Sequence, residues 1–333
     1  MTPTKPGEPI PVVIDCDPGI DDALALYLAF ASPELDVLAV SAVAGNVGLE
    51  RAADNAARLL DHLGVPADVP LYAGAEGPLA GSERVPDEPV HGPGGLGGVV
   101  LAEAAREIAP GHAADALAGL LRDRPGEITV IALGPLTTIA TMLRRHADVA
   151  DAIGELVIMG GAVFTQGNVT PAAEFNFHAD PEAAHEVLSA GLPVRLVGLD
   201  VTRAALVPAE VADVLAASPR PVGEAGRMLA HLAGRYAERF GVRAAPVHDA
   251  LAVAAVVRPG LLEYTAGSAA VERVGELTRG AVVADVRGVT GRPATTRFAT
   301  GVDADAFVRM LYTRISRYTA GRPVIDTSLE ESA

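Results

Sequence analysis

One stretch near the start of the chain, residues 12–26, limits the possible fold and chemistry more than any other. It reads VVIDCDPGIDDALAL, so β-favouring apolar residues lead into four aspartates and then into an Ala/Leu-rich segment. This order predicts a buried strand, a tight Pro-Gly turn and the start of a helix. Because Asp15 and Asp17 are two residues apart at the end of a strand, their side chains are expected to point the same way.

The clustered aspartates indicate a metal site. Asp15, Asp17, Asp21 and Asp22 repel one another unless positive charge lies among them. A helix N-terminus stabilises a carboxylate by only ~0.3–1 kcal/mol, whereas carboxylate oxygens are well matched to a hard cation such as Ca²⁺ or Mg²⁺. The alternative interpretation is a solvated acidic turn that caps the helix.

Length and composition narrow the class of protein. Half of the 333 residues are hydrophobic, enough for the core of one large α/β domain or two smaller ones. A net charge of −16 argues against nucleic acid and anionic membranes as partners. The single cysteine, Cys16, is interpreted as a small buried residue and is typical of a reducing compartment. Without an apolar leader or a span of about 20 apolar residues, the expected location is the cytoplasm.

Strand-like and helical segments alternate along the chain. Strands are expected at 12–14, 37–43, 128–133, 156–159 and 194–199, and helices at 21–30, 49–63, 113–122, 137–145, 181–190, 208–217, 223–240, 250–257 and 303–318. This alternation predicts an α/β fold with a mostly parallel central sheet flanked by helices, and a small antiparallel part over 262–297. We expect a flexible N-terminus over 1–9, a single domain over 10–320 and a loose tail over 321–333.

Polar residues follow several predicted strands, which is where ligands bind in such sheets. The candidates at strand ends, on loops or at a helix start are Asp15, Asp17, Asn46, Leu133, Met159, Glu174, Asn176, His248 and Asp249. Carboxylates and amides with few basic groups suit a metal and a hydroxyl-rich ligand better than a phosphate. Asp200 is interpreted as a strand terminator, and Asn55 and Arg58 as solvated helix positions. The glycine-rich segment 73–100 is either a functional loop or a mobile connection.

These residues also carry a family resemblance. The DCDPGIDD stretch at 15–22 resembles the signature of the inosine–uridine-preferring nucleoside hydrolases. Further motifs follow in the family's order: Gly45-Asn46, His91-Gly92, GPLT at 134–137, Met159-Gly160-Gly161, AEFN at 173–176, DPEA at 180–183 and His248-Asp249. The resemblance covers about residues 10–318. It implies a Rossmann-like nucleoside hydrolase fold, assembly as a homodimer or homotetramer, and Ca²⁺-dependent hydrolysis of purine or pyrimidine ribonucleosides to ribose and free base.

The resemblance also implies roles for individual residues. Asp17, Asp22, Asp249 and the Leu133 carbonyl would hold Ca²⁺, and Asp17 would be the general base for a metal-activated water. Asp21, Asn46, Met159, Asn168, Glu174, Asn176 and Asp249 would contact the ribose, with Asn168 and Glu174 at its 5′-hydroxyl. His248 would assist the leaving base, since the ordinary pKa of histidine lies near neutrality. Possible base contacts are His91, Tyr236 and Phe240, the last two sharing a helix face; ordinary packing is an equal alternative for them.

Three other functions compete with this interpretation. A metal-dependent phosphatase also uses Asp-x-Asp after a strand, but it needs a downstream cation for phosphate, and the only lysine is Lys5. An EF-hand would need Gly and Glu where Ile20 and Leu26 stand. A catalytically weak ribose- or nucleoside-binding relative would keep the fold. The oxocarbenium-like transition state of glycoside hydrolysis is well served by clustered carboxylates, which favours the hydrolase.

Overall fold

The fold is described from a computed structural model, which covers residues 7–81 and 88–320. Most of the predicted flexible N-terminus and the whole predicted tail at 321–333 lie outside the described residues. Part of the glycine-rich segment, residues 82–87, lies outside them as well.

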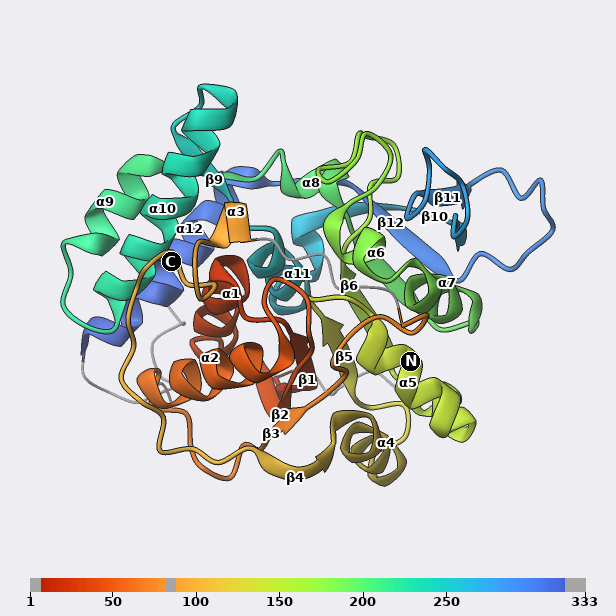
Figure 1. The fold of residues 1–333 in the computed structure, drawn as a ribbon, viewed down its shortest axis with the longest axis horizontal. Coiled ribbons are helices and arrows are strands. Elements are labelled where there is room, and N and C mark those ends of the chain that lie inside the picture. Colours follow the sequence, from red (N-terminus) through yellow and green to blue (C-terminus); the bar gives the residue numbers. More distant parts are fainter. Residues whose placement is uncertain (1–6, 82–87, 321–333) are drawn as a thin grey trace.

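A ten-stranded sheet runs through the molecule in the order β11-β10-β12-β7-β6-β5-β1-β2-β3-β4 (Figure 1). Its strands are β1 (Ile10–Cys16), β2 (Leu35–Ala42), β3 (Leu71–Ala73), β4 (Ala109–His112), β5 (Thr129–Ala132), β6 (Glu155–Met159), β7 (Val194–Val197), β10 (Leu262–Val271), β11 (Val282–Asp285) and β12 (Thr296–Val302). Neighbouring strands from β4 across to β12 are parallel, and β10 is antiparallel to β11 and β12. The predicted mostly parallel sheet with a small antiparallel part is confirmed.

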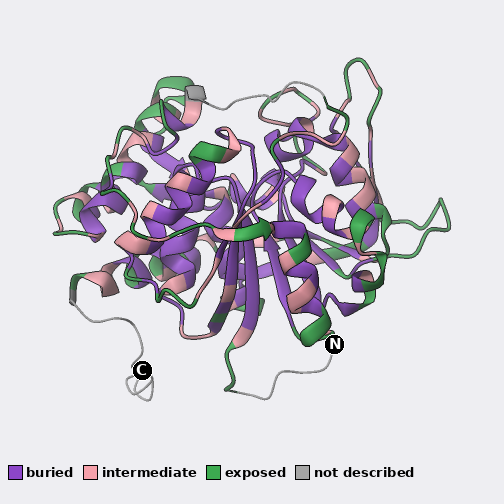
Figure 2. Cartoon of the chain, turned by 60° about the horizontal axis from the view of Figure 1, so that its bottom comes forward, coloured by how far each residue is buried: buried purple, intermediate pink, exposed green. Residues whose placement is uncertain are grey.

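Helices cover both faces of this sheet. They are α1 (Ile20–Phe30), α2 (Leu49–His62), α3 (Glu88–His91), α4 (Ala113–Asp123), α5 (Thr137–Arg145), α6 (Phe175–Ala179), α7 (Pro181–Ser189), α8 (Leu199–Thr202), α9 (Ala209–Ala216), α10 (Val222–Phe240), α11 (His248–Val257) and α12 (Ala304–Ser316). Alternate residues of β1 enter different cores: Val12 and Ile14 pack with α1, α10, α11 and α12, while Val13 packs with α4, α5 and α7. The central strands β1, β5, β6 and β7 are consequently buried, and exposed residues lie on the outer helices and loops (Figure 2). Among the described residues, no helix combines the length and the apolarity needed to cross a membrane.

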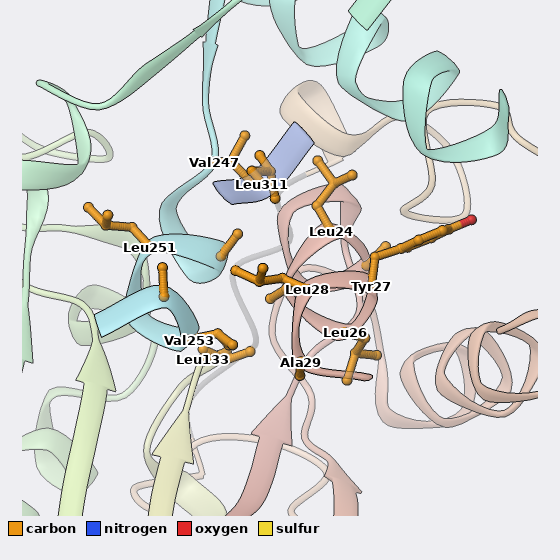
Figure 3. Packing of buried hydrophobic residues seen from close by; sticks show 14 of the residues in the cluster. Leu24, Leu26, Tyr27, Leu28, Ala29, Leu133, Val247, Leu251, Val253 and Leu311 are labelled. Carbon is orange, nitrogen blue, oxygen red and sulfur yellow. The ribbon is translucent and has the colours of Figure 1, made fainter. Parts of the chain in front are cut away.

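Helix α1 lies inside the molecule because it is apolar on every side. Residues Ile20–Ala29 are all buried, and Leu24 and Leu28 belong to the cluster that also contains Leu251 of α11 and Leu311 of α12 (Figure 3). The acidic first turn of α1 is therefore held in a fixed place by the core rather than by solvent.

Strand β1 is the point where the order of the sheet reverses. The chain passes from β1 to β2, β3 and β4 on one side, and β5, β6 and β7 then build the other side. In parallel sheets the connections diverge at such a point and leave a crevice beyond the carboxyl ends of the strands. Asp17 follows β1 and Leu133 follows β5, so both lie at this crevice.

Some local predictions were wrong. The predicted strand at 194–199 ends at Val197, because Leu199 N donates to the Gly161 carbonyl and the chain turns into α8. The predicted antiparallel part over 262–297 reaches the start of β12, which is antiparallel to β10 but joins β7 in parallel. The short strands β3 and β4, helix α6, and the separate antiparallel pair β8 (Leu206–Pro208) and β9 (Ala244–Pro246) were not predicted, because three to five residues show no reliable periodicity.

Asn55 is another correction, because it is buried rather than solvated. Its amide donates to the carbonyls of Pro18 (3.0 Å) and Gly94 (2.8 Å), and half-buried Arg58 donates to the Leu101 carbonyl. The described part of the glycine-rich loop thus folds back over α2, with Gly94 and four other glycines of 92–98 at positive φ. The loop connects α2 to the turn that follows β1.

Candidate functional site

A pocket opens at the crevice beside β1. All the residues that the sequence predicted for the site line it except Asp15 and Asp22: Asp17, Asp21, Asn46, His91, Leu133, Met159, Asn168, Glu174, Asn176, Tyr236, Phe240, His248 and Asp249. These residues come from segments far apart in the sequence, and the sheet topology brings them together. Asp15, by contrast, is not among the lining residues; it is buried and accepts a hydrogen bond from the Ser41 hydroxyl.

Buried carboxylates form a cluster at the site. One oxygen each of Asp21, Asp22 and Asp249 lies within 4.8 Å of the others. This cluster of three differs from the carboxylate ligands that the resemblance implied, because it contains Asp21 in place of Asp17. Burial, and then repulsion from Asp22, raises the pKa of Asp17 well above its ordinary value, while burial and then repulsion from Asp21 does the same to Asp249.

The donor set of this cluster fits a hard divalent cation. All candidate ligand atoms are oxygens, which suits Ca²⁺ or Mg²⁺ rather than a softer metal. In the described part of the chain, neither arginine nor lysine forms an ion pair with Asp17, Asp22 or Asp249. Because buried carboxylates need a compensating charge, a cation bound here would complete this arrangement.

Asp22 and Asn46 shape the turn that carries Asp17. Asp22 accepts hydrogen bonds from the backbone N–H groups of Asp17 and Gly19, both at 3.0 Å. The Asn46 backbone N–H donates to Asp17 Oδ2 at 2.6 Å, and its side-chain amide donates to Asp22 Oδ2 at 3.2 Å. The helix-capping interpretation and the metal interpretation are therefore compatible, since Asp22 caps α1 and lies in the cluster.

The space around Asp17 requires glycine at two positions. A Cβ atom at Gly45 would lie 2.0 Å from Asp17 Oδ2, and one at Gly134 would lie 2.5 Å from Oδ1. Real Cβ atoms do not approach so closely, so an added methyl group at either position must displace the carboxylate.

Replacing Gly45 by alanine is expected to lower kcat/KM by about 10²-fold, the effect of a displacement of about 1 Å in a catalytic group. Gly48→Ala is the matched control, because a Cβ there meets nothing within 4 Å. Steady-state kinetics with uridine or inosine would compare the two variants. Equal activity of Gly45→Ala and Gly48→Ala would contradict the tight fit around Asp17.

On the β5 and β6 side, an amide orients the Leu133 carbonyl. Asn176 Nδ2 donates to Leu133 O at 2.6 Å and to Met159 O at 3.2 Å. Glu174 caps α6, with Oε1 accepting from Asn176 N and Oε2 from Gly161 N. Burial raises the pKa of Glu174 to about 7 despite these bonds. Asn168 joins the same wall, where its Oδ1 accepts from Phe175 N.

His248 is the first residue of α11 and lies on the opposite wall. Its Nδ1 is 2.7 Å from the Thr202 hydroxyl. Burial, and then the positive charge of Arg203, lowers the pKa of His248 to about 3. The ordinary value of a histidine therefore does not apply in this environment, and burial favours the neutral form of the ring.

His91 and an aromatic pair complete the lining. His91 is buried; its Nδ1 accepts from Ile20 N at 3.1 Å, and its Nε2 lies 3.8 Å from Asp21 Oδ1. Tyr236 and Phe240 of α10 have ring centroids 4.6 Å apart. Because both rings line the pocket, simple core packing does not account for them.

Sequence reasoning missed seven further lining residues, namely Val90, Phe175, Arg203, Leu232, Arg235, Arg239 and Pro246. Two of them could have been predicted from the sequence. Arg235 and Arg239 directly precede Tyr236 and Phe240 on α10 and share their four-residue spacing, so they belong to the same turns of the helix. Arg203 carried no such signal, because its position depends on the unpredicted helix α8.

Comparisons with known proteins match nearly the whole chain to nucleoside hydrolases. Residues 12–309 match the family described as inosine-uridine preferring nucleoside hydrolase. A pyrimidine-specific ribonucleoside hydrolase RihA of Photobacterium profundum is 38% identical over 310 residues, covering 92% of this chain and 99% of the relative. The RihA of Klebsiella pneumoniae is 39% identical over 312 residues, with coverage of 93% and 99%.

Solved structures give the same result. A plant nucleoside hydrolase, PpNRh1, superposes with a TM-score of 0.87 at 33% identity, covering 92% of this chain and 99% of that chain. A purine-preferring ribonucleoside hydrolase from Gardnerella vaginalis superposes with a TM-score of 0.88 at 29% identity, covering 94% and 100%. The chain therefore belongs to the inosine-uridine preferring nucleoside hydrolase family, and it is a ribonucleoside hydrolase acting on N-glycosyl bonds.

Proposed function

We propose that this enzyme cleaves the N-glycosidic bond of purine or pyrimidine ribonucleosides with the help of Ca²⁺, releasing ribose and free base. The observation that carries the proposal is the buried cluster of Asp21, Asp22 and Asp249, two of which line the pocket together with Asp17. A vicinal diol such as that of ribose is a suitable ligand for an oxygen-seeking cation.

We assign the metal ligands to Asp17, Asp22, Asp249 and the Leu133 carbonyl, as the resemblance implies. The all-oxygen donor set supports this assignment. So does the observation that, over residues 7–81 and 88–320, Asp17, Asp22 and Asp249 form no ion pair with an arginine or lysine. When bound, Ca²⁺ supplies charge compensation and lowers the pKa of a water in its shell. Asn176 supports the site by holding the Leu133 carbonyl in a fixed direction.

Asp17 is the proposed general base. Glycines at 45 and 134 hold its carboxylate in a tight space, and Asn46 N donates to one of its oxygens. The other proposed contacts are to the ribose. They are Asp21 and Asn46 at the 2′-hydroxyl, Asp249 and Asn176 at the 3′-hydroxyl, Asn168 and Glu174 at the 5′-hydroxyl, and Met159 beside the sugar. Together these acidic and amide groups favour the positive charge that develops on the sugar.

His248 is proposed to assist the departing base. Because its pKa is lowered to about 3, the neutral ring is the form that acts, and it does so by donating an N–H hydrogen bond to the base. Tyr236 and Phe240 would stack on the base, and His91 would lie near it. We also propose assembly as a homodimer or homotetramer, following the family resemblance.

The assay that tests this function measures base release from uridine, cytidine, inosine and adenosine in parallel. We expect turnover of at least one nucleoside, with ribose formed in equal amount. The same series resolves base preference, since RihA relatives are named pyrimidine-specific and the Gardnerella enzyme purine-preferring. Tight binding of nucleosides without base release would instead favour a catalytically weak relative.

A further inference from the structure

Three polar residues in and just after α8 contact different parts of the site. Asp200 and Thr202 belong to this four-residue helix, and Arg203 follows it directly. From the sequence, Asp200 was predicted only to end a strand, and no role was predicted for Thr202 or Arg203. Each of the three forms hydrogen bonds to an element that carries a proposed substrate contact.

Arg203 and Asp200 hold the loop between β6 and α6. The Asp200 carboxylate accepts from Val163 N at 3.0 Å and from Phe164 N at 2.6 Å. The Arg203 guanidinium donates to the carbonyls of Gln166 and Gly167, both at 2.7 Å.

These two carbonyls immediately precede Asn168. A planar guanidinium that donates to two successive carbonyls fixes their direction as well as their distance. Arg203 thereby limits where the next residue, Asn168, can place its side chain, and Arg203 itself lines the pocket.

Thr202 holds the other wall. Its side chain is buried, and its hydroxyl lies 2.7 Å from Nδ1 of His248. A hydrogen bond on Nδ1 restricts rotation of the imidazole and leaves Nε2 as the ring nitrogen for a ligand. Thr202 and Arg203 are adjacent in sequence, so one short helix links the His248 wall to the Asn168 loop.

We propose that α8 and Arg203 form a positioning element, in which Thr202 orients His248 toward the leaving base while Arg203 and Asp200 hold the Asn168 loop at the ribose 5′-hydroxyl. The inference rests on the proposed roles of His248 and Asn168. Thr202 and Arg203 are positioning residues, since each acts through another residue.

The test of Thr202 uses two substrates that differ in their need for help at the leaving group. Uridine needs assistance at its base, whereas 4-nitrophenyl β-D-ribofuranoside releases a stable anion without protonation. Thr202→Val keeps the shape and removes the hydroxyl. We expect it to lower kcat/KM for uridine by about 10–100-fold, part of the 10²–10⁴-fold range for acid–base assistance, and to change the nitrophenyl substrate less than about twofold.

Thr202→Ser is the matched control and should restore uridine hydrolysis, because it keeps the hydroxyl. Equal loss on both substrates, or no loss on either, would overturn the role of Thr202. His248→Ala measured in parallel separates this inference from the proposed function. If His248→Ala fails to spare the nitrophenyl substrate, the leaving-base role of His248 is wrong, and the inference is wrong with it.

The test of Arg203 compares uridine with 5′-deoxyuridine. Arg203→Met should raise KM for uridine about tenfold, with little change in KM for the 5′-deoxy substrate, and Asn168→Ala should show the same pattern. Arg203→Lys, which lacks the two-pronged geometry, should recover only part of the loss. If Asn168→Ala discriminates between the substrates and Arg203→Met does not, the proposed substrate contact stands and the positioning role of Arg203 is refuted.

Discussion

Asp17→Ala is expected to lower kcat/KM for nucleosides by at least about 10²–10⁴-fold, the usual contribution of a general base. The variant also removes a proposed metal ligand, so the loss should reach or exceed the upper end of that range. The measurement is steady-state base release at saturating Ca²⁺. Because Asp17 lies in a turn fixed independently by Asp22 and Asn46, circular dichroism should show an intact fold.

Two further variants define the role of Asp17. Asp17→Asn keeps the shape and an acceptor for the Asn46 N–H, so it isolates the loss of charge. Asp151→Ala, at an exposed position on the 3₁₀ turn Ala147–Ala152, is the control for a general loss of negative charge. Turnover close to that of the unmodified enzyme in Asp17→Ala would refute the general-base assignment.

Removal of the metal is expected to abolish activity and to lower the thermal unfolding midpoint. Asp17, Asp22 and Asp249 are buried beside one another, and no arginine or lysine of the described chain is paired with them. A cation bound at about 100 times its dissociation constant stabilises the folded state by about 2.7 kcal/mol, and a chelator removes that contribution. Calorimetry and base release before and after EGTA, followed by added Ca²⁺, measure both effects.

The pH dependence of the metal-free protein gives an independent check. The pKa values of Asp17 and Asp249 are raised above their ordinary value of 3.8 in the folded state. Such groups ionise first in the unfolded chain, so the metal-free protein should lose stability as the pH rises above about 4. The Ca²⁺-loaded protein should not show this loss. Full activity and an unchanged midpoint in EGTA would contradict the metal site, and recovery with Mg²⁺ but not Ca²⁺ would correct the ion.

Much of the fold followed from local patterns in the sequence. The strand, turn and helix over 12–30 were predicted because an apolar run, a Pro-Gly pair and an Ala/Leu-rich segment each favour one local structure. The start of α7 at Pro181 was predicted in the same way, and the structure shows that Asp180 caps this helix, with Oδ1 accepting from Ala183 N at 3.0 Å. Most long helices differ from prediction by only one or two residues at their ends.

The candidate site was predicted as a list of residues but not as an arrangement. The strand ends and the family resemblance pointed to the lining residues, since these signals are local in the sequence. They could not reveal that Asn55 is buried under the Gly94 loop or that Asp21 lies in the tightest carboxylate group. Both facts depend on segments that meet only after the chain has folded.

The sequence by itself therefore determined the α/β class, the position of the acidic turn after β1 and most of the residues at the pocket. The tertiary structure alone decided which hydrogen bonds position those residues and how burial and neighbouring charges shift their pKa values. Thr202 reaches His248 across 46 positions of the chain, and Arg203 reaches Gly167 across 36. The physical reason is that periodicity and turn chemistry act between near neighbours, whereas burial, repulsion and hydrogen bonds at the site act between residues that are distant in sequence.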